Sequence, residues 1–141
     1  MVVDTNIFIN AIFHGDIYSQ RVLQLIADGR IRLLTTERIE DEILQVHILH
    51  VLEPRRLSLE QVKRPFLKLL KLLRMAETIS APQVFNACVD PDDNKFFDCA
   101  IAGHADYIIS MNSDLGTASK VAVPVLSPWQ FLQEAIEVSG R

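Results

Sequence analysis

Five acidic residues stand where apolar runs of the chain end or where helical patterns begin, and these side chains could do chemistry together. They are Asp4, Glu42, Asp93, Asp98 and Asp114. Several carboxylates in one crevice repel one another unless they are protonated or bound to a cation. Mg²⁺ and Mn²⁺ relieve such repulsion, because hard divalent cations prefer oxygen ligands. The reaction that such a site predicts is metal-assisted hydrolysis of a phosphodiester bond, with a bound water as the nucleophile.

The elements that position these acids follow from the alternation of short β-prone runs with longer helical patterns. This alternation is typical of a parallel sheet covered by helices on both faces. We expect strands at residues 1–3, 32–35, 77–79, 107–110 and 121–126, and helices at residues 18–28, 36–49, 59–74, 94–104 and from 128 onward. Pro124 places the last strand at a sheet edge. Pro65 makes the segment 59–74 either two helices or one kinked helix.

This arrangement predicts where the acids lie. With right-handed crossovers, strand ends and the starts of the following helices gather at one edge of the sheet, where ligands bind. Asp4 ends the first strand, Glu42 lies in the helix after the second strand, and Asp114 follows the fourth. Asp93 and Asp98 flank the first turns of the helix that precedes the fourth strand. We therefore expect a single α/β domain with all five acids in one crevice.

Composition and charge limit the function classes. The chain has 141 residues, of which 49% are hydrophobic and 23% charged, and this predicts one globular domain over residues 1–141. Its net charge of −4 argues against a protein that coats nucleic acid with its whole surface. Cys88 and Cys99 have no disulfide-rich or metal-site spacing, so we expect reduced core cysteines and a cytoplasmic protein. The sequence also predicts no signal peptide and no membrane span.

Four segments of the chain carry a resemblance to a known family. They are V-V-D-T-N-I-F at 2–8, D-E-I-L-Q-V at 41–46, D-P-D-D-N-K-F-F-D at 90–98 and A-D-Y-I-I-S at 105–110. The chain is similar to the PIN-domain ribonucleases, especially the toxin components of prokaryotic toxin-antitoxin pairs. The resemblance runs from Met1 to about the final helix. It implies a three-layer α/β/α sandwich with a mainly parallel sheet, and a Mg²⁺- or Mn²⁺-dependent endoribonuclease restrained by an antitoxin protein.

The resemblance also assigns roles to single residues. Asp4, Glu42 and Asp98 match the metal-binding acids of the family, and Asp93 matches a further acid of this branch. The groups that would orient these carboxylates and a water are Thr5, Asn6, Ser110 and Asn112.

The fourth acidic position departs from the family pattern. Family members usually end the fourth strand with Thr or Ser, one further residue and then Asp, but here Ser110 and Met111 are followed by Asn112. The neutral amide oxygen of Asn112 is a poorer ligand than a carboxylate. Either Asp114 therefore replaces the missing carboxylate, or the second cation site is weakened.

The segment 53–77 concentrates positive charge. It holds seven of the 14 basic residues and only three acidic ones. One interpretation is a solvated helix face whose long side chains cover a leucine-rich stripe. The other is a basic rim that steers RNA toward the acids, with Lys63, Arg64, Lys68 and Lys71 as RNA-binding residues. The many leucines of the same segment also indicate a helix-mediated homodimer.

Other interpretations stay open. Taken singly, Asp93 could cap a helix, Glu42 could point into water and Asp114 could stabilise a turn. A degenerate PIN-like protein could bind RNA or a protein without cleaving, which Asn112 would explain. A phosphohydrolase of the haloacid-dehalogenase type also begins with an Asp after its first strand, but it needs a second Asp where this chain has Asn6. His47 and His50 could share a metal, yet no third ligand completes a zinc site.

Overall fold

A parallel sheet forms the centre of the molecule. The structure is a computed structural model that describes residues 1–52, 58–112, 115 and 123–139. Among these residues the strands are β1 (Val2–Val3), β2 (Leu34–Thr35), β3 (Glu77–Thr78), β4 (Ile108–Ile109) and β5 (Val125–Leu126). Their order is β3-β2-β1-β4-β5, and every neighbouring pair is parallel. The expected strands are thus present in shortened form, and β5 lies at the edge, as Pro124 predicted.

The register of the central strand explains which chain segments meet. Val2 pairs with Leu34 of β2 on one side and with Ile108 of β4 on the other. Val3 pairs with Ile109. Because the strands are parallel, the residues that directly follow β1 and β4 emerge next to each other at one edge of the sheet.

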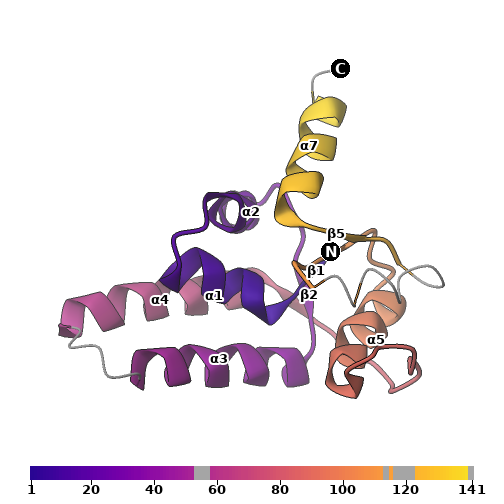
Figure 1. The fold of residues 1–141 in the computed structure, drawn as a ribbon, viewed down its shortest axis with the longest axis horizontal. Coiled ribbons are helices and arrows are strands. Elements are labelled where there is room, and N and C mark those ends of the chain that lie inside the picture. Colours follow the sequence, from indigo (N-terminus) through magenta and orange to yellow (C-terminus); the bar gives the residue numbers. More distant parts are fainter. Residues whose placement is uncertain (53–57, 113–114, 116–122, 140–141) are drawn as a thin grey trace.

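Helices cover the sheet. They are α1 (Thr5–Phe13), α2 (Ile17–Ala27), α3 (Glu37–Leu52), α4 (Leu59–Met75), α5 (Asn94–Ala102) and α7 (Pro128–Ser139), with the short 3-10 turn η1 (Pro91–Asp93) before α5. α5 packs against β1, β2 and β4, whereas α1 packs against α2 and α3. Figure 1 shows α5 and α1 on opposite sides of β1 and β2, with α3 and α4 extending beside α1. This is the three-layer α/β/α fold that the sequence predicted.

The helix α1 was not predicted from the sequence pattern. Of its nine residues, those that are buried are Thr5, Ile7, Phe8, Ile9 and Ala11. Apolar periodicity marks a helix when one face meets solvent and the other meets the core. α1 is apolar on most of its surface, so no single stripe indicated a helix.

The sequence left open whether Pro65 divides the segment 59–74 into two helices. It is one continuous helix with Pro65 inside it. Ser58 and Gln61 form the expected capping box at its start, each side chain bonding the backbone N–H of the other residue. Leu69 and Leu72 are buried against the core. This packing offsets the backbone hydrogen bond that proline removes.

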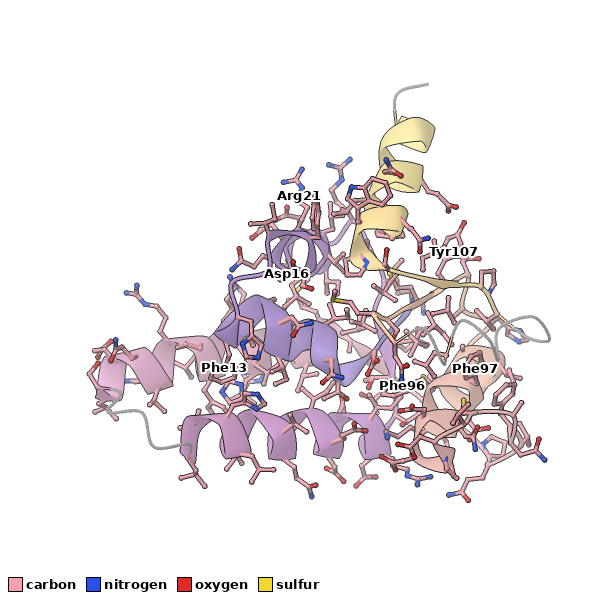
Figure 2. The ribbon with its side chains drawn as sticks, viewed as in Figure 1. Phe13, Asp16, Arg21, Phe96, Phe97 and Tyr107 are labelled. Atoms are coloured by element: carbon pink, nitrogen blue, oxygen red, sulfur yellow. The ribbon has the colours of Figure 1, made fainter. Side chains whose placement is uncertain are left out.

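The core lies on both sides of the sheet, against α5 on one side and against α1 to α4 on the other. Phe96 and Phe97 on α5, which Figure 2 labels, are fully buried. Phe97 stacks on Phe85 from the preceding loop, with ring centroids 4.2 Å apart. Cys88 and Cys99 are free thiols and buried, which confirms the expected reduced core cysteines. Within the described ranges, no helix has the length and apolar character needed to cross a membrane.

Candidate active site

Asp4 lies at the carboxyl end of β1 and is almost fully buried. The Ser110 hydroxyl, at the end of β4, donates a hydrogen bond of 2.7 Å to Oδ2 of Asp4. The backbone N–H of Asp4 donates to the carbonyl of Ile109. Burial raises the pKa of the Asp4 carboxyl and repulsion from Glu42 adds to the rise, while the Ser110 hydrogen bond opposes it. The fold therefore holds a poorly solvated carboxylate at the edge where parallel sheets bind ligands.

Asn112 extends this contact to a second acid. Its backbone N–H donates to Oγ of Ser110 at 3.0 Å, and its side-chain amide donates to Oδ2 of Asp93 at 3.3 Å. Ser110 and Asn112 thus link Asp4 to Asp93 in one hydrogen-bonded chain. Burial, followed by repulsion from Asp4 and Asp90, raises the pKa of Asp93 to about 6. Asp93 is the residue before α5, but its side chain makes no capping hydrogen bond there, so the cap interpretation does not account for it.

Glu42 comes from α3 and does not point into water. Its side chain is 28% exposed and forms an ion pair with the ammonium of Lys95 on α5. Burial lowers the pKa of Lys95, but its hydrogen bonds and charge interactions with Glu42 and Asp92 outweigh burial and raise the pKa overall. Lys95 therefore stays charged beside the acids.

Lys95 is a site residue that sequence reasoning missed. The helix predicted at 94–104 is rich in apolar residues, and a lysine in such a helix is rarely buried without a partner. That mismatch was the available signal, because it requires an acidic residue from another element close to Lys95.

Asp98 has a different environment from the other acids. It is buried, and its Oδ1 accepts hydrogen bonds from the backbone N–H groups of Val84 and Phe85, at 2.9 and 2.8 Å. This carboxylate fastens the loop before η1 onto α5. Among the described residues, no hydrogen bond is made to the second oxygen of Asp98.

A cleft of about 570 Å³ opens beside Asp98 and Lys95. Residues from the start of α3 and from the end of β3 form its other walls, among them Thr36, Arg38 and Thr78. Nη2 of Arg38 lies 3.8 Å from Oδ1 of Asp92. The cleft thus lies next to Asp98 and Lys95 and has hydroxyl groups and a cation in its walls, which are groups that can contact a polar substrate.

Comparison with known proteins agrees with this geometry. The family model of the PIN domain matches residues 1–114. The chain belongs to the PIN-domain family. An uncharacterized protein of Methanocaldococcus jannaschii is 28% identical over an alignment of 144 residues. This alignment covers 95% of this chain and 90% of that protein. No solved structure matches the chain. PIN domains are nuclease-like folds that usually hydrolyse nucleic acids with the help of divalent metal ions.

Only some of the expected acids of this PIN domain lie together. Asp4, Glu42 and Asp93 are close enough for each to affect the pKa of another. Asp98 is tied to its loop, and Asp114 lies outside the described residues. In the described part of the chain, no three His, Cys, Asp or Glu side chains are arranged to hold a metal ion as they stand.

The residues expected to orient the acids differ in placement. Ser110 and Asn112 contact Asp4 and Asp93 as described above, and Asn6 is exposed. Thr5 is buried, and its hydroxyl has no hydrogen-bond partner among the described residues. A buried hydroxyl without a partner is costly, and this one belongs to the residue that follows Asp4.

The basic residues expected to bind RNA lie on α4. Arg64 and Lys68 line a second cavity of about 580 Å³ together with Arg21 of α2, and Lys63 and Lys71 are exposed. This second cavity shares no lining residue with the cleft beside Asp98. The basic segment of this PIN domain thus forms a surface of its own.

Proposed function

We propose that this chain is a metal-dependent ribonuclease that hydrolyses RNA phosphodiester bonds at the cluster of Asp4, Glu42 and Asp93. The observation that carries the proposal is the chain of hydrogen bonds from Asp4 through Ser110 and Asn112 to Asp93. It holds two mutually repelling carboxylates side by side at the ligand-binding edge of a PIN domain. Maintaining such repulsion is costly to a protein unless a ligand, here a cation, relieves it.

The donor chemistry at this edge fits Mg²⁺ or Mn²⁺. The side chains supply carboxylate and amide oxygens, which hard divalent cations prefer. The buried Thr5 hydroxyl without a partner is consistent with a missing polar ligand, such as a metal-bound water. Asp4, Asp93 and Glu42 would hold the metal, with Asp98 and Asp114 as the further acids that the family resemblance assigns.

The bound cation would supply a water of lowered pKa and stabilise charge on the leaving oxygen. The chain's own residues prepare the site for this. Ser110 fixes the orientation of the Asp4 carboxylate, and Asn112 does the same for Asp93. Burial and the repulsion from Asp4 raise the pKa of Asp93 in the metal-free chain, and a bound cation would relieve this repulsion and favour the ionised carboxylate.

The proposal also includes the biological role, the location, the RNA-binding residues and the oligomeric state of the protein. The role as a toxin with an antitoxin partner rests on the family resemblance, and the cytoplasmic location rests on the reduced cysteines Cys88 and Cys99. RNA binding by Lys63, Arg64, Lys68 and Lys71 rests on their charge and on the exposure of α4. A homodimer through α4 is supported by Leu67, which is 52% exposed, whereas Leu69 and Leu72 of the same helix are buried.

A second candidate function is binding of RNA or of a protein without cleavage. Two observations favour it: an amide occupies the position where the family usually has an acid, and Lys95 already neutralises Glu42. These features reduce the negative charge available to a metal.

Product chemistry tests the proposed function. Attack by a metal-activated water does not use the 2′-hydroxyl of RNA. We therefore expect the purified protein to cleave an RNA and its 2′-O-methyl analogue with Mn²⁺ or Mg²⁺, without 2′,3′-cyclic phosphate ends and not in EDTA. Cleavage that persists in EDTA, or that leaves cyclic phosphates, would contradict the mechanism, and binding without cleavage would favour the second candidate.

A further inference from the structure

Lys95 is a buried cation at the edge of the acid cluster, with a side chain only 4% exposed. Its ammonium nitrogen contacts Oε2 of Glu42, the backbone carbonyl of Asp92 at 2.7 Å and Oδ2 of Asp92 at 3.0 Å. An ammonium group has three N–H donors. Three oxygen atoms of the protein therefore surround the ammonium, two as hydrogen-bond acceptors on Asp92 and one as the ion-pair partner on Glu42.

The contacts of Lys95 connect three elements of the site. Glu42 belongs to α3, Asp92 to η1 and Lys95 itself to α5. The ammonium also lies 4.9 Å from the ring centroid of Phe96, a position that favours a positive charge. The cation is thus held firmly between the helix that supplies Glu42 and the turn that supplies Asp93.

A divalent cation and Lys95 would compete for the same carboxylate. Asp4 and Asp93 interact electrostatically with Glu42, yet the contact of Glu42 given by the structure is the ion pair with Lys95. In the described part of the chain, this arrangement leaves no three-ligand group ready for a metal.

We propose that Lys95 is a built-in cation that takes the place of a divalent metal ion at Glu42 and has to release this carboxylate when metal binds. The inference rests on the proposed function, because it assumes that the acid cluster binds a divalent cation. Lys95 is in this view a positioning residue, which keeps Glu42 in the site while metal is absent. It also weakens metal binding, since the metal has to displace an existing ion pair.

Replacing Lys95 by methionine tests both of its proposed effects, the stabilisation of Glu42 in the metal-free site and the weakening of metal binding. Lys95→Met keeps a long apolar side chain but removes the charge, so Glu42 becomes available and the cluster gains negative charge. We expect the Kd for Mn²⁺ to fall about tenfold, within the usual range of coupling between two ligands. The metal-free variant should melt at a lower temperature than the parent, because Glu42 has lost its buried partner. Mn²⁺ should therefore raise the Tm of the variant more than that of the parent.

The experiment is a Mn²⁺ titration of the full chain by calorimetry, with thermal melting in the absence and presence of Mn²⁺. Arg30→Met is the matched control, because Arg30 is exposed after the end of α2, outside both the acid cluster and the basic segment. It should bind Mn²⁺ as the parent does. A Kd in Lys95→Met equal to or weaker than that of the parent would overturn the inference, whereas the proposed function would stand.

The remaining outcomes are also decisive. If Lys95→Met folds only in the presence of Mn²⁺, the metal replaces the lysine and the inference is supported. If it folds in neither condition, Lys95 is a structural residue that metal cannot replace, and the inference fails. Absence of Mn²⁺ binding to both the parent and the variant would contradict the proposed function together with the inference.

Discussion

The Ser110 hydroxyl lies 2.7 Å from Oδ2 of Asp4, although 106 positions separate the two residues in the sequence. The parallel pairing of β1 with β4 produces this contact, because it places Val3 beside Ile109 and so brings the next residue of each strand to the same edge. The hydrogen bond favours the ionised form of a buried carboxylate. It therefore links the topology of the sheet directly to the charge of the candidate site.

Ser110→Ala should make metal binding more dependent on pH. Loss of the hydroxyl removes the interaction that opposes the raised pKa of Asp4, so a larger share of this carboxyl is protonated in mildly acidic solution. We expect Mn²⁺ binding to weaken about tenfold at pH 6 and less at pH 8, since a hydrogen bond to a charged group contributes about 1.5–3 kcal/mol. Calorimetric titrations at both pH values measure this. Ser80→Ala, in the neighbouring cleft, is the control, and identical pH profiles for parent and Ser110→Ala would contradict the prediction.

Asp98→Ala should destabilise the protein far more than Asp98→Asn. The alanine variant leaves the backbone N–H groups of Val84 and Phe85 without their acceptor, whereas the asparagine oxygen can still accept both hydrogen bonds. We expect losses in the free energy of unfolding of about 3 kcal/mol for alanine and about 1 kcal/mol for asparagine. Denaturant unfolding of the metal-free proteins checks this. Equal losses would show that the loop does not depend on this carboxylate.

Asp93→Asn should stabilise the metal-free protein above neutral pH. The pKa of Asp93 is about 6 in the folded chain, against an ordinary value of 3.8, so the folded state binds more protons between these pH values. The charged carboxylate thus costs stability above pH 6, and this cost disappears as the pH falls toward 4. We expect the variant to be more stable at pH 8 by up to about 1 kcal/mol, a discounted figure because water screens a half-exposed carboxylate.

Unfolding of both proteins at pH 8 and pH 4.5 measures the effect of Asp93→Asn. The stability difference should shrink at the lower pH. Added Mn²⁺ should stabilise the parent more than the variant, because the metal relieves the same repulsion. A variant that is less stable than the parent at pH 8 would contradict the electrostatic explanation.

His47→Leu should stabilise the protein, and more so in acid. His47 is buried among Phe13 and Phe66, and neither of its ring nitrogens has a hydrogen-bond partner among the described residues. Burial, and then the charge of His50, lower its pKa, so the unfolded chain binds more protons below about pH 6.5 and the parent loses stability as the pH falls through that value.

Thermal melting of His47→Leu at two pH values tests this. We expect a gain of about 1 kcal/mol at pH 7.5 from removing the buried polar group, and a larger gain at pH 5.5. His104→Asn is the control, because His104 is exposed and its φ of 52° suits asparagine. A gain that does not change with pH would mean that His47 does not titrate in this range.

The sequence predicted the parts of the site that depend on strand ends. The residue after an apolar run is at the edge of a parallel sheet wherever the run is a strand, so the positions of Asp4 and Ser110 followed from pattern alone. The edge position of β5 followed from Pro124 for a similar local reason. Glu42 could be assigned to its helix because α3 has clear apolar periodicity.

The parts that the sequence did not predict depend on contacts between distant segments. Asp98 accepts two hydrogen bonds from a loop without any periodic pattern, and these contacts could not be predicted. The ion pair of Lys95 with Glu42 joins two helices whose facing sides no local pattern specifies. The helix α1 was missed because it is buried on most sides, which hides the pattern that marks a surface helix.

Metal-dependent RNA cleavage by the acid cluster can be measured by comparing the parent with a variant that lacks two of the acids. The parent and the double variant Asp4→Asn, Asp93→Asn are incubated with a structured RNA in Mn²⁺, Mg²⁺ or EDTA. A second double variant, Asp28→Asn, Asp106→Asn, is the matched control, because both of its acids are exposed and outside the cluster. We predict cleavage by the parent and the control only with metal, and a loss of at least about 100-fold in the cluster variant, because two of the carboxylates that would hold the cation are removed. Equal cleavage by the parent and the cluster variant, or no cleavage by folded parent protein in any metal, would mean that the acid cluster is not a metal-dependent ribonuclease site.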